Sequence, residues 1–377
     1  MSLTRSLERR KLQERAVNLL TRMVEIYSPT GSEEPLASFL AEELDKRGFK
    51  TLTDSVGNVF GSTGSGSPHI LLCGHMDVVP PKLPIKMEDG ILYGRGTADA
   101  KGPLATMIEA VTQLVEEGFK TKITVGGLVD EEGNNTGSKQ LSSDGIDADY
   151  AIFGEPTNVD TVTVGYKGGL LVEVTCKTET GHSSAPWMFQ NSIEKAMEIW
   201  NLINGLHMPE ENLDSRFFSL SKNLRYITGG RKSSVVPDSC TIQIGIRIPP
   251  GITVEGLTTE VTALVDSYRK ENPDIAVEMS ILDHSEPILA NKKSKVVKAF
   301  AQAIYRKKGK PGMLVNKTGT GDMNIFGPAT GIPVVTYGPG DSHLDHTSGE
   351  HIVIEDYLEG ISVLKEALKT LVKLHNR

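Results

Sequence analysis

Cysteine is scarce in this sequence. Its 377 residues include three cysteines, Cys73, Cys176 and Cys240, which are widely spaced and form no Cys-x-x-Cys motif. An odd, scattered set of cysteines argues against a disulfide framework and against a thiolate zinc site. We therefore expect three free, buried thiols in a reducing, cytoplasmic environment.

Long apolar segments and an excess of positive charge are also missing. No run of about 18 apolar residues is present, so the sequence predicts no membrane-spanning helix. The segment 5–11 near its start is charged, where a secretory signal would be apolar. The chain has 48 acidic and 40 basic residues, a net charge of −8, which disfavours nucleic acid and anionic membranes as partners.

Two patterns of apolar segments divide the chain. Up to Phe153, short apolar runs alternate with helical segments, which predicts a mostly parallel sheet with helices on both faces. From about Gly168 to Asp283 the order becomes strand, helix, strand, strand, helix, strand, as in the ferredoxin-like unit. The first pattern then resumes. We therefore predict an α/β protein in which a discontinuous domain, 1–167 and 284–377, is interrupted by an inserted α+β domain, 168–283.

Acidic and imidazole side chains follow three apolar runs that read as buried strands, 69–73, 123–129 and 150–153. The carboxyl ends of parallel strands meet at one edge of an α/β sheet, which is the usual place for a ligand site. Two histidines and several carboxylates gathered there would bind two divalent cations and could carry out metal-assisted hydrolysis. The residues concerned are His75, Asp77, Glu131, Glu132 and Glu155, together with Asp99 and the late His346.

Two of these motifs have ordinary explanations as well as functional ones. His75 and Asp77 are two residues apart, so on a strand they share a face, and the carboxylate can orient a ligating imidazole. The ordinary explanation is a His–Asp pair on the protein surface, which would have the same spacing. The adjacent Glu131 and Glu132 repel each other unless a cation or proton separates them. One could ligate while the other stays free as a general base. The alternative is an exposed acidic turn at 130–135.

Asp99 lies in the glycine-rich segment 94–102, just before a predicted helix. Glycine lets a backbone approach a metal closely, although an ordinary turn with Asp99 capping the helix explains the segment equally well. A dinucleotide-binding loop does not fit, because Gly94-x-Gly96 lacks the third glycine of that fingerprint.

Three further signals lie outside these motifs. Glu155 precedes Pro156, so it ends a strand in a rigid turn. His182 lies in the loop 180–186, which is free of bulky residues, and it could stabilise a developing oxyanion or be an exposed loop residue. A late cluster cannot consist of ligands alone; it comprises His343, Asp345, His346, Glu350 and His351.

Together these segments resemble the M20 family of two-metal peptidases and deacylases, which includes acetylornithine deacetylase, succinyl-diaminopimelate desuccinylase and aminoacylase. The resemblance covers nearly the whole chain, the inserted domain included. It implies that one zinc ion is held by His75, Asp99 and Glu155. It implies a second zinc ion held by Asp99, Glu132 and His346, with Asp99 bridging. Cobalt suits the same ligands.

The resemblance also implies roles for the residues around the metals. Asp77 would orient His75, and Glu131 would be the general base. His182 matches a histidine on the lid that the partner subunit supplies in dimeric members. Arg247 matches an arginine that grips a substrate carboxylate, a role that suits a bidentate guanidinium. His346 is chosen from the late cluster because 346–350 matches the family's His-x-x-x-Glu.

Within the family, the loops 317–324 and 337–342 look most like the lysine and ornithine biosynthesis branch. Members of that branch release lysine or ornithine from N-acetyl forms or from an amino-group carrier protein. An acid near the substrate amine, Asp322 or Asp341, would suit a cationic side chain. One departure is Lys101-Gly102-Pro103, where the family usually has Lys-Gly-Gly.

The prediction is therefore a cytoplasmic dinuclear zinc amidohydrolase that acts on a small N-acyl amino acid or on a carrier-linked one. We expect a homodimer in which the inserted domain is both lid and dimerisation surface. The alternative activities are a succinyl-diaminopimelate desuccinylase and a dipeptidase or aminopeptidase with the same metals. A binding module with a structural metal is a different class, and the free acid Glu131 argues against it because a structural site needs no base.

Overall fold

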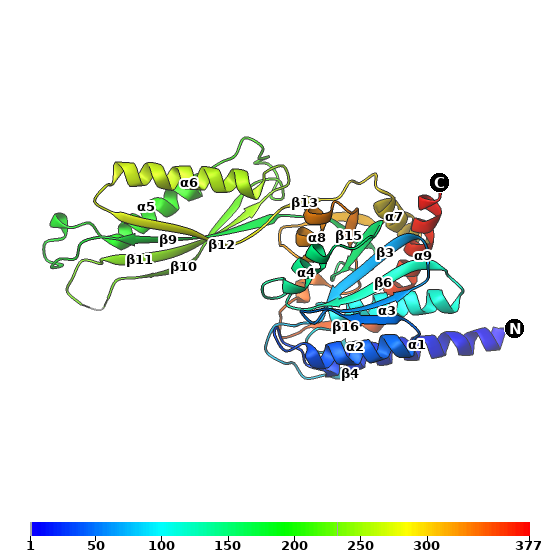
Figure 1. The fold of residues 1–377 in the computed structure, drawn as a ribbon. Helices are drawn as coiled ribbons and strands as arrows, with labels where there is room; N and C mark the ends of the chain where they lie inside the picture. Colours follow the sequence, from blue (N-terminus) through cyan, green and yellow to red (C-terminus); the bar gives the residue numbers. More distant parts are fainter. Residues whose placement is uncertain (1, 232) are drawn as a thin grey trace. The chain divides into compact units, whose positions relative to one another are not determined.

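The computed structural model describes residues 2–231 and 233–377, and these divide into two compact units. Unit 1 comprises 1–165, 290–316 and 321–377, and unit 2 comprises 166–289 and 317–320. The order of sequence elements gave no indication that the short segment 317–320 groups with unit 2. Figure 1 shows the elements of both units in chain order.

Unit 1 is built on a mixed, mostly parallel sheet. The central strands β6, β3, β7 and β15 are parallel neighbours, while β1, β2 and β8 pair antiparallel at the sides. Nearly every residue of β3 is buried, as expected of a strand covered on both faces. The strands are β1 Lys50–Thr53, β2 Val59–Thr63, β3 Gly66–His75, β6 Thr121–Leu128, β7 Tyr150–Gly154, β8 Thr161–Tyr166, β14 Met313–Lys317 and β15 Val334–Thr336.

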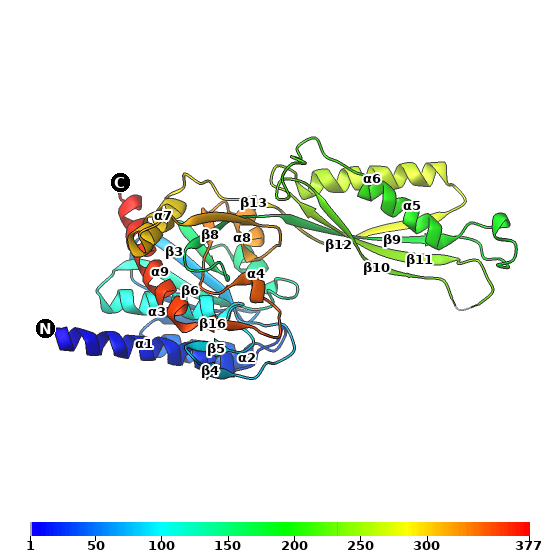
Figure 2. The same cartoon turned by 180° about the vertical axis from the view of Figure 1, so that it is seen from behind.

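Helices cover this sheet and complete the core. Helix α3 packs along β3, β6 and β7, and α9 packs against α3 and α7 (Figure 2). Almost all of α3 is buried, because it lies between the sheet and the outer helices. The helices of unit 1 are α1 Ser2–Glu25, α2 Glu34–Lys46, α3 Lys101–Glu116, α4 Thr136–Asp144, α7 Lys295–Lys308, α8 Asp322–Thr330 and α9 Ile354–His375, with a 3₁₀ turn, η2, at Ser342–Leu344.

A small antiparallel sheet joins two distant parts of unit 1. It consists of β4 Lys86–Glu88, β5 Ile91–Tyr93 and β16 His351–Val353. Strands of three residues carry too little alternation to be read from a sequence, and this sheet was not predicted. It places the chain around 350 beside the glycine-rich segment 94–102.

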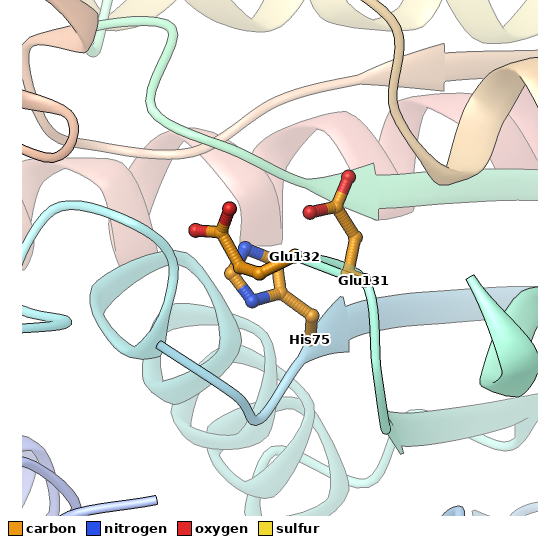
Figure 3. Close-up of side chains that lie close together, drawn as sticks. All are labelled: His75, Glu131 and Glu132. Atoms are coloured by element: carbon orange, nitrogen blue, oxygen red, sulfur yellow. The ribbon is translucent and has the colours of Figure 1, made fainter. Parts of the chain in front are cut away.

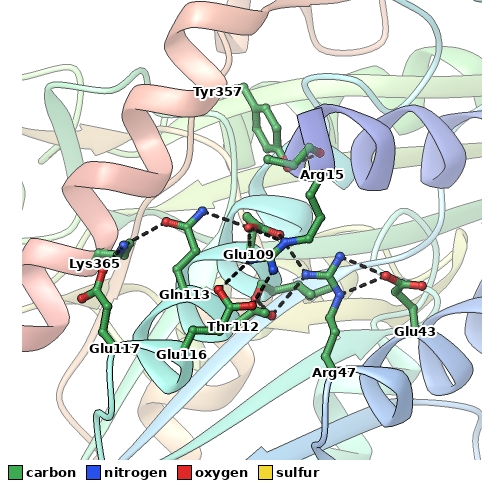
Figure 4. A network of polar contacts seen from close by, with 12 residues as sticks. Arg15, Glu43, Arg47, Glu109, Thr112, Gln113, Glu116, Glu117, Tyr357 and Lys365 are labelled. Atoms are coloured by element: carbon green, nitrogen blue, oxygen red, sulfur yellow. Dashed lines mark hydrogen bonds and ion pairs between the residues drawn. The ribbon is translucent and has the colours of Figure 1, made fainter. Parts of the chain in front are cut away.

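A buried acid ties three helices of unit 1 together (Figure 4). Glu109 of α3 is fully buried; its Oε1 lies 2.6 Å from Nη2 of Arg15 on α1, and its Oε2 lies 2.8 Å from Nη1 of Arg47 at the end of α2. Arg47 also pairs with Glu43 at 2.9 Å. The buried carboxylate thus forms ion pairs with two guanidinium groups, which compensate the cost of burying its charge.

The variant Glu109→Gln is expected to destabilise the protein by about 3 kcal/mol, because it leaves two guanidinium groups without their buried partner. Urea denaturation followed by circular dichroism measures the change. Glu42→Gln is the control: Glu42 pairs with Lys46 on the surface, and such pairs contribute about 0–1 kcal/mol. Equal stabilities of the two variants would contradict the prediction.

Unit 2 has the strand and helix order that the sequence predicted for the inserted segment. Its sheet is antiparallel in the order β10-β11-β9-β12, and α5 and α6 pack on one face over a separate core. Burial alternates along β9 and β11, so the opposite face is polar. The elements are β9 Gly168–Lys177, η1 Pro186–Met188, α5 Ser192–Asn204, β10 Ser221–Gly229, β11 Ser239–Ile248, α6 Val254–Glu271, β12 Ala276–Ser285 and β13 Ile288–Leu289.

The predicted fold class, a mostly parallel α/β sheet with an inserted ferredoxin-like α+β unit, is confirmed. Cys73, Cys176 and Cys240 are free and buried. None of the described helices is long and apolar enough to cross a membrane.

Candidate metal centre

The site begins where β3 ends. His75 is the last residue of this strand and is fully buried, as is Asp77 two residues later. Nδ1 of His75 donates to the backbone carbonyl of Asp77 at 2.9 Å and lies 3.5 Å from the Asp77 carboxylate. The ring is therefore held with Nε2 free to face a ligand, the arrangement typical of metal-binding histidines.

The Asp77 carboxylate also holds the loop that follows β6. Its oxygens accept the backbone N–H of Glu131 at 3.1 Å and that of Glu132 at 3.0 Å, as well as the hydroxyl of Thr30 at 2.9 Å. Figure 3 shows the imidazole of His75 at the end of β3 and the two glutamates on the neighbouring loop, with their carboxylates at separate positions. One buried acid thus positions both the histidine and the glutamate pair.

Asp99 is held by the late part of the chain. Glu350 is buried and accepts the backbone N–H groups of Gly96, Ala98 and Asp99 at 2.9 to 3.1 Å, while Arg95 pairs with its second oxygen at 2.7 Å. Three amides and a guanidinium on one carboxylate fix the loop around Asp99. The spacing His-x-x-x-Glu does not by itself reveal this role of Glu350.

Around Asp99 the predicted ligands come together. Nε2 of His75 lies 3.1 Å from one oxygen of Asp99 and 3.8 Å from Glu155. Nε2 of His346 lies 3.2 Å from the other oxygen of Asp99 and 2.9 Å from Glu132. His346 has a φ of +62°, a left-handed backbone that non-glycine residues rarely adopt and that is found preferentially at functional sites.

These side chains form three groups whose candidate ligand atoms lie within 4.8 Å of one another. Two of the groups are the sets expected from the sequence, with Asp99 in both. The third brings Glu131 near His75 and Glu132, so Glu131 borders the same centre. The groups are His75, Asp99 and Glu155; Asp99, Glu132 and His346; and His75, Glu131 and Glu132.

The electrostatics of the cluster favour cations. Burial, reinforced by neighbouring carboxylates such as Glu155, raises the pKa of Glu131 well above its usual value, and burial also raises that of Glu132. The pKa of His346 is raised to about 9, mainly by its hydrogen bond to Asp99. Carboxylates crowded in this way need positive charge, and imidazole with carboxylate oxygens is a donor set that suits zinc or cobalt. The residues present therefore fit two divalent ions.

The other predicted site residues have separate surroundings. Asp322 begins α8 in unit 1 and is buried, and burial raises its pKa to about 6; among the described residues, its Oδ1 has no hydrogen-bond partner. Asp341 caps the 3₁₀ turn 342–344 and lies 2.7 Å from Nδ1 of His343. His182 and Arg247 belong to unit 2. Nδ1 of the exposed His182 accepts a hydrogen bond from the backbone N–H of Ser184 at 3.1 Å.

Lys101 is a second residue whose surroundings the sequence did not indicate. It is fully buried, and its Nζ donates to the backbone carbonyls of Met23 at 3.2 Å and Ile26 at 2.7 Å. Burial lowers its pKa to about 7. It thereby fastens the start of α3, directly after Asp99, to the end of α1.

Removing the Glu350 side chain should weaken metal binding without touching a ligand. Glu350→Ala is expected to lower zinc affinity about 10- to 100-fold, the usual cost of losing a group that orients a ligand. Titration against a competing chelator measures the affinity. Glu355→Ala, which removes an exposed acid at the start of α9, is the matched control. Equal affinities in the two variants would refute the orienting role.

The chain is similar to known proteins over nearly its whole length. Residues 71–370 match the model of peptidase family M20/M25/M40. A protein of Sulfurisphaera tokodaii named LysW-lysine/LysW-ornithine hydrolase is 32% identical over 373 residues, 98% of this chain and 99% of its own. A protein of Pyrococcus furiosus, provisionally named for the same activity, is 37% identical over 359 residues, 95% of this chain and 98% of its own.

The fold has solved counterparts as well. The crystal structure of a tripeptidase from Staphylococcus aureus superposes with a TM-score of 0.81, covering 96% of this chain and 99% of its own at 24% sequence identity. At that identity the likeness concerns the fold.

Proposed function

The chain belongs to the M20 family of peptidases and is a hydrolase of amide bonds, and from this premise we propose that it releases lysine or ornithine from the amino-group carrier protein LysW in amino-acid biosynthesis. The observation that carries the proposal is the end-to-end similarity to proteins named for that reaction. The alignment with the Sulfurisphaera tokodaii protein spans 98% of this chain. It therefore includes unit 1, which contains the cluster of candidate ligands, and unit 2.

The proposed cofactors are two zinc ions, with cobalt as an alternative. One would be held by His75, Asp99 and Glu155, and the other by Asp99, Glu132 and His346. Within each set the candidate ligand atoms lie within 4.8 Å of one another. When bound, such cations polarise an amide carbonyl and make water a better nucleophile.

The proposed chemistry of the chain's own residues centres on Glu131. Its carboxylate takes a proton from the attacking water as the new C–O bond forms, and it then gives that proton to the leaving amine as the C–N bond breaks. Asp77 keeps the backbone of 131–132 in place through two hydrogen bonds. His182 is proposed to stabilise the oxyanion.

Recognition of the amino acid is proposed to rest on charge. Arg247 presents a planar fork of donors that matches an α-carboxylate. Asp322, which is buried with one oxygen unpartnered among the described residues, would receive the cationic side chain of lysine or ornithine. Asp341 is the weaker candidate, since its carboxylate already caps a turn and pairs with His343. We further propose a cytoplasmic homodimer that pairs through unit 2, which light scattering would test.

A substrate panel tests the proposed activity. The purified zinc-loaded enzyme is given LysW-linked lysine, LysW-linked ornithine, N-acetyl-lysine, N-succinyl-diaminopimelate and a neutral dipeptide, and amine release is measured. The carrier-linked compounds should have the highest kcat/KM. A clear preference for the succinyl compound or the dipeptide would overturn the proposal in favour of a desuccinylase or a dipeptidase. No hydrolysis of any amide would favour a non-catalytic binding module.

Arg247→Ala should lower kcat/KM about 10- to 100-fold on substrates with a free α-carboxylate, the usual effect of losing a charge-assisted hydrogen-bonded pair. Amidating that carboxylate in the substrate should cost the wild type a similar factor and the variant much less, because the partner is already gone. Steady-state kinetics of the wild type and the variant, each on free and on amidated substrate, measures the coupling between Arg247 and the α-carboxylate. Equal wild-type rates on free and amidated substrate would favour an aminopeptidase.

A further inference from the structure

A groove on the polar face of unit 2 contains more positive charge than one substrate carboxylate requires. Its volume is about 420 Å³, and it lies entirely within unit 2. Two arginines line it, Arg247 near the end of β11 and Arg225 on the neighbouring edge strand β10. Asn223, Ser285 and Thr320 supply neutral polar groups beside them. The proposed function uses Arg247 alone and leaves Arg225 unexplained.

The backbone aims Arg225 at this groove. In the antiparallel pairing of β10 with β11, Leu224 lies opposite Ile244 and Tyr226 lies opposite Gln243, so Arg225 has no opposing residue. An extra residue of this kind is a β-bulge, which turns a side chain away from the regular alternation and recurs beside binding sites. Strand alternation places Arg225 on the same face as Asn223, and the bulge leaves its side chain without an opposing residue on β11.

A glycine on β11 makes room for the Arg225 side chain. A Cβ at Gly245 would lie 2.8 Å from Cδ of Arg225, so the aliphatic stem of the arginine rests directly on the glycine. Gly245 and Arg247 are two residues apart on one strand and share a face of the sheet. The stem thus runs across β11 next to Arg247.

No described residue neutralises either arginine. Among the described residues, Arg225 and Arg247 form no ion pair, and the side chain of Arg247 makes one weak hydrogen bond, from Nη1 to the hydroxyl of Thr320 at 3.3 Å. Burial lowers the pKa of Arg247, and the positive charge of Arg225 lowers it further. Asp283 lines the same groove but forms an ion pair with neither arginine. Nζ of Lys222 donates hydrogen bonds to the backbone carbonyls of Asn204 and Leu206. An anionic ligand would reduce the electrostatic repulsion between these two neighbouring guanidinium groups.

We propose that Arg225 and Arg247 form a subsite for two carboxylates of one substrate, and that Arg225 selects an acyl group that carries its own carboxylate. This inference rests on the proposed function. Arg247 takes the α-carboxylate of the amino acid, and Arg225 takes the second carboxylate, each as a bidentate pair. The ligand class is an amide of an amino acid with a dicarboxylic acyl group, such as succinyl, glutaryl or γ-glutamyl. Simple acetyl compounds lack the second anion.

Two substrates that differ only in the second carboxylate provide the kinetic test. The zinc-loaded wild-type enzyme and Arg225→Gln are compared on γ-glutamyl-lysine, in which the lysine α-amino group is acylated, and on its 4-aminobutyryl analogue, which lacks the α-carboxylate of the glutamyl group. The wild type should prefer the γ-glutamyl compound about 10- to 100-fold in kcat/KM, and Arg225→Gln should lose most of that preference. An unchanged preference in Arg225→Gln would overturn the inference.

Two further variants separate the subsite from unspecific effects. Arg216→Gln removes an exposed arginine of unit 2 that lies outside the groove, and it should keep the wild-type preference; if it loses as much as Arg225→Gln, general surface charge is responsible and the inference fails. Gly245→Ala keeps every charge but pushes on the Arg225 stem, so it should reduce the preference as well. Circular dichroism confirms that each variant is folded.

A binding measurement keeps the inference testable apart from turnover. Calorimetry with glutarate and with butyrate probes the groove in the wild-type protein, where glutarate should bind about tenfold or more tightly than butyrate. Arg225→Gln should abolish this difference. If no amide is hydrolysed but glutarate binds through Arg225, the proposed function fails and the subsite stands. If amides are hydrolysed with no discrimination by Arg225, only the subsite fails.

Discussion

The Glu131→Gln variant is expected to retain both metals and to lose about two to four orders of magnitude in kcat, the typical contribution of a general base. The reason lies in the different positions of the two adjacent glutamates. Glu132 has an oxygen 2.9 Å from His346, within a group of candidate ligands that includes Asp99. Glu131 lies beside this set, and burial raises its pKa well above the usual value. A glutamine there keeps the shape but cannot take a proton.

Glu132→Gln is the matched control, because the same chemical change is made one residue away. It should lose zinc, since an amide is a poor substitute for a carboxylate ligand. Elemental analysis of both dialysed variants, together with kcat on the preferred substrate, distinguishes the two roles. If Glu131→Gln loses a zinc ion and Glu132→Gln keeps both, the base and the ligand have been assigned the wrong way round.

Much of unit 1 could be predicted because its central strands are buried on both faces. Strands such as β3 and β7 read as continuous apolar runs. The parallel pairing of these strands brings together His75, the last residue of β3, and Glu155, which follows β7. The inserted unit could be predicted for a related reason. Its strands alternate in burial over a single core, and its helices are amphipathic.

What could not be predicted depends on pairing between distant segments. Glu350 acts on the loop around Asp99 because β16 pairs with β5, and strands of three residues leave no periodic signal. The bulge at Arg225 is visible only in the register of β10 against β11. Likewise, 317–320 joins unit 2 through contacts that no local pattern encodes. In each case a side chain receives its role from a partner far away in the sequence.

Removing the metals should abolish activity, with a loss of about three orders of magnitude or more, since polarisation of the carbonyl and activation of water are each worth several kcal/mol. Protein dialysed against a chelator is assayed before and after one to two equivalents of zinc or cobalt are added back, and activity should return with the second equivalent. The control is Glu131→Gln, which takes up the ions without regaining turnover. Full activity in the metal-free protein would sink the two-metal proposal.

The affinity for zinc should also rise with pH, and the residues of the cluster set the direction. In the metal-free protein, hydrogen bonding to Asp99 raises the pKa of His346 to about 9, and burial raises that of Glu132. His346 therefore holds a proton at neutral pH that a metal must displace, and the raised pKa of Glu132 adds to this competition in the same direction, since only the deprotonated forms are ligands. Zinc affinity should increase between about pH 6 and pH 9 and level off above the folded-state pKa of His346. A chelator competition series across this range measures it, and an affinity that falls with rising pH would show that His346 is not a ligand.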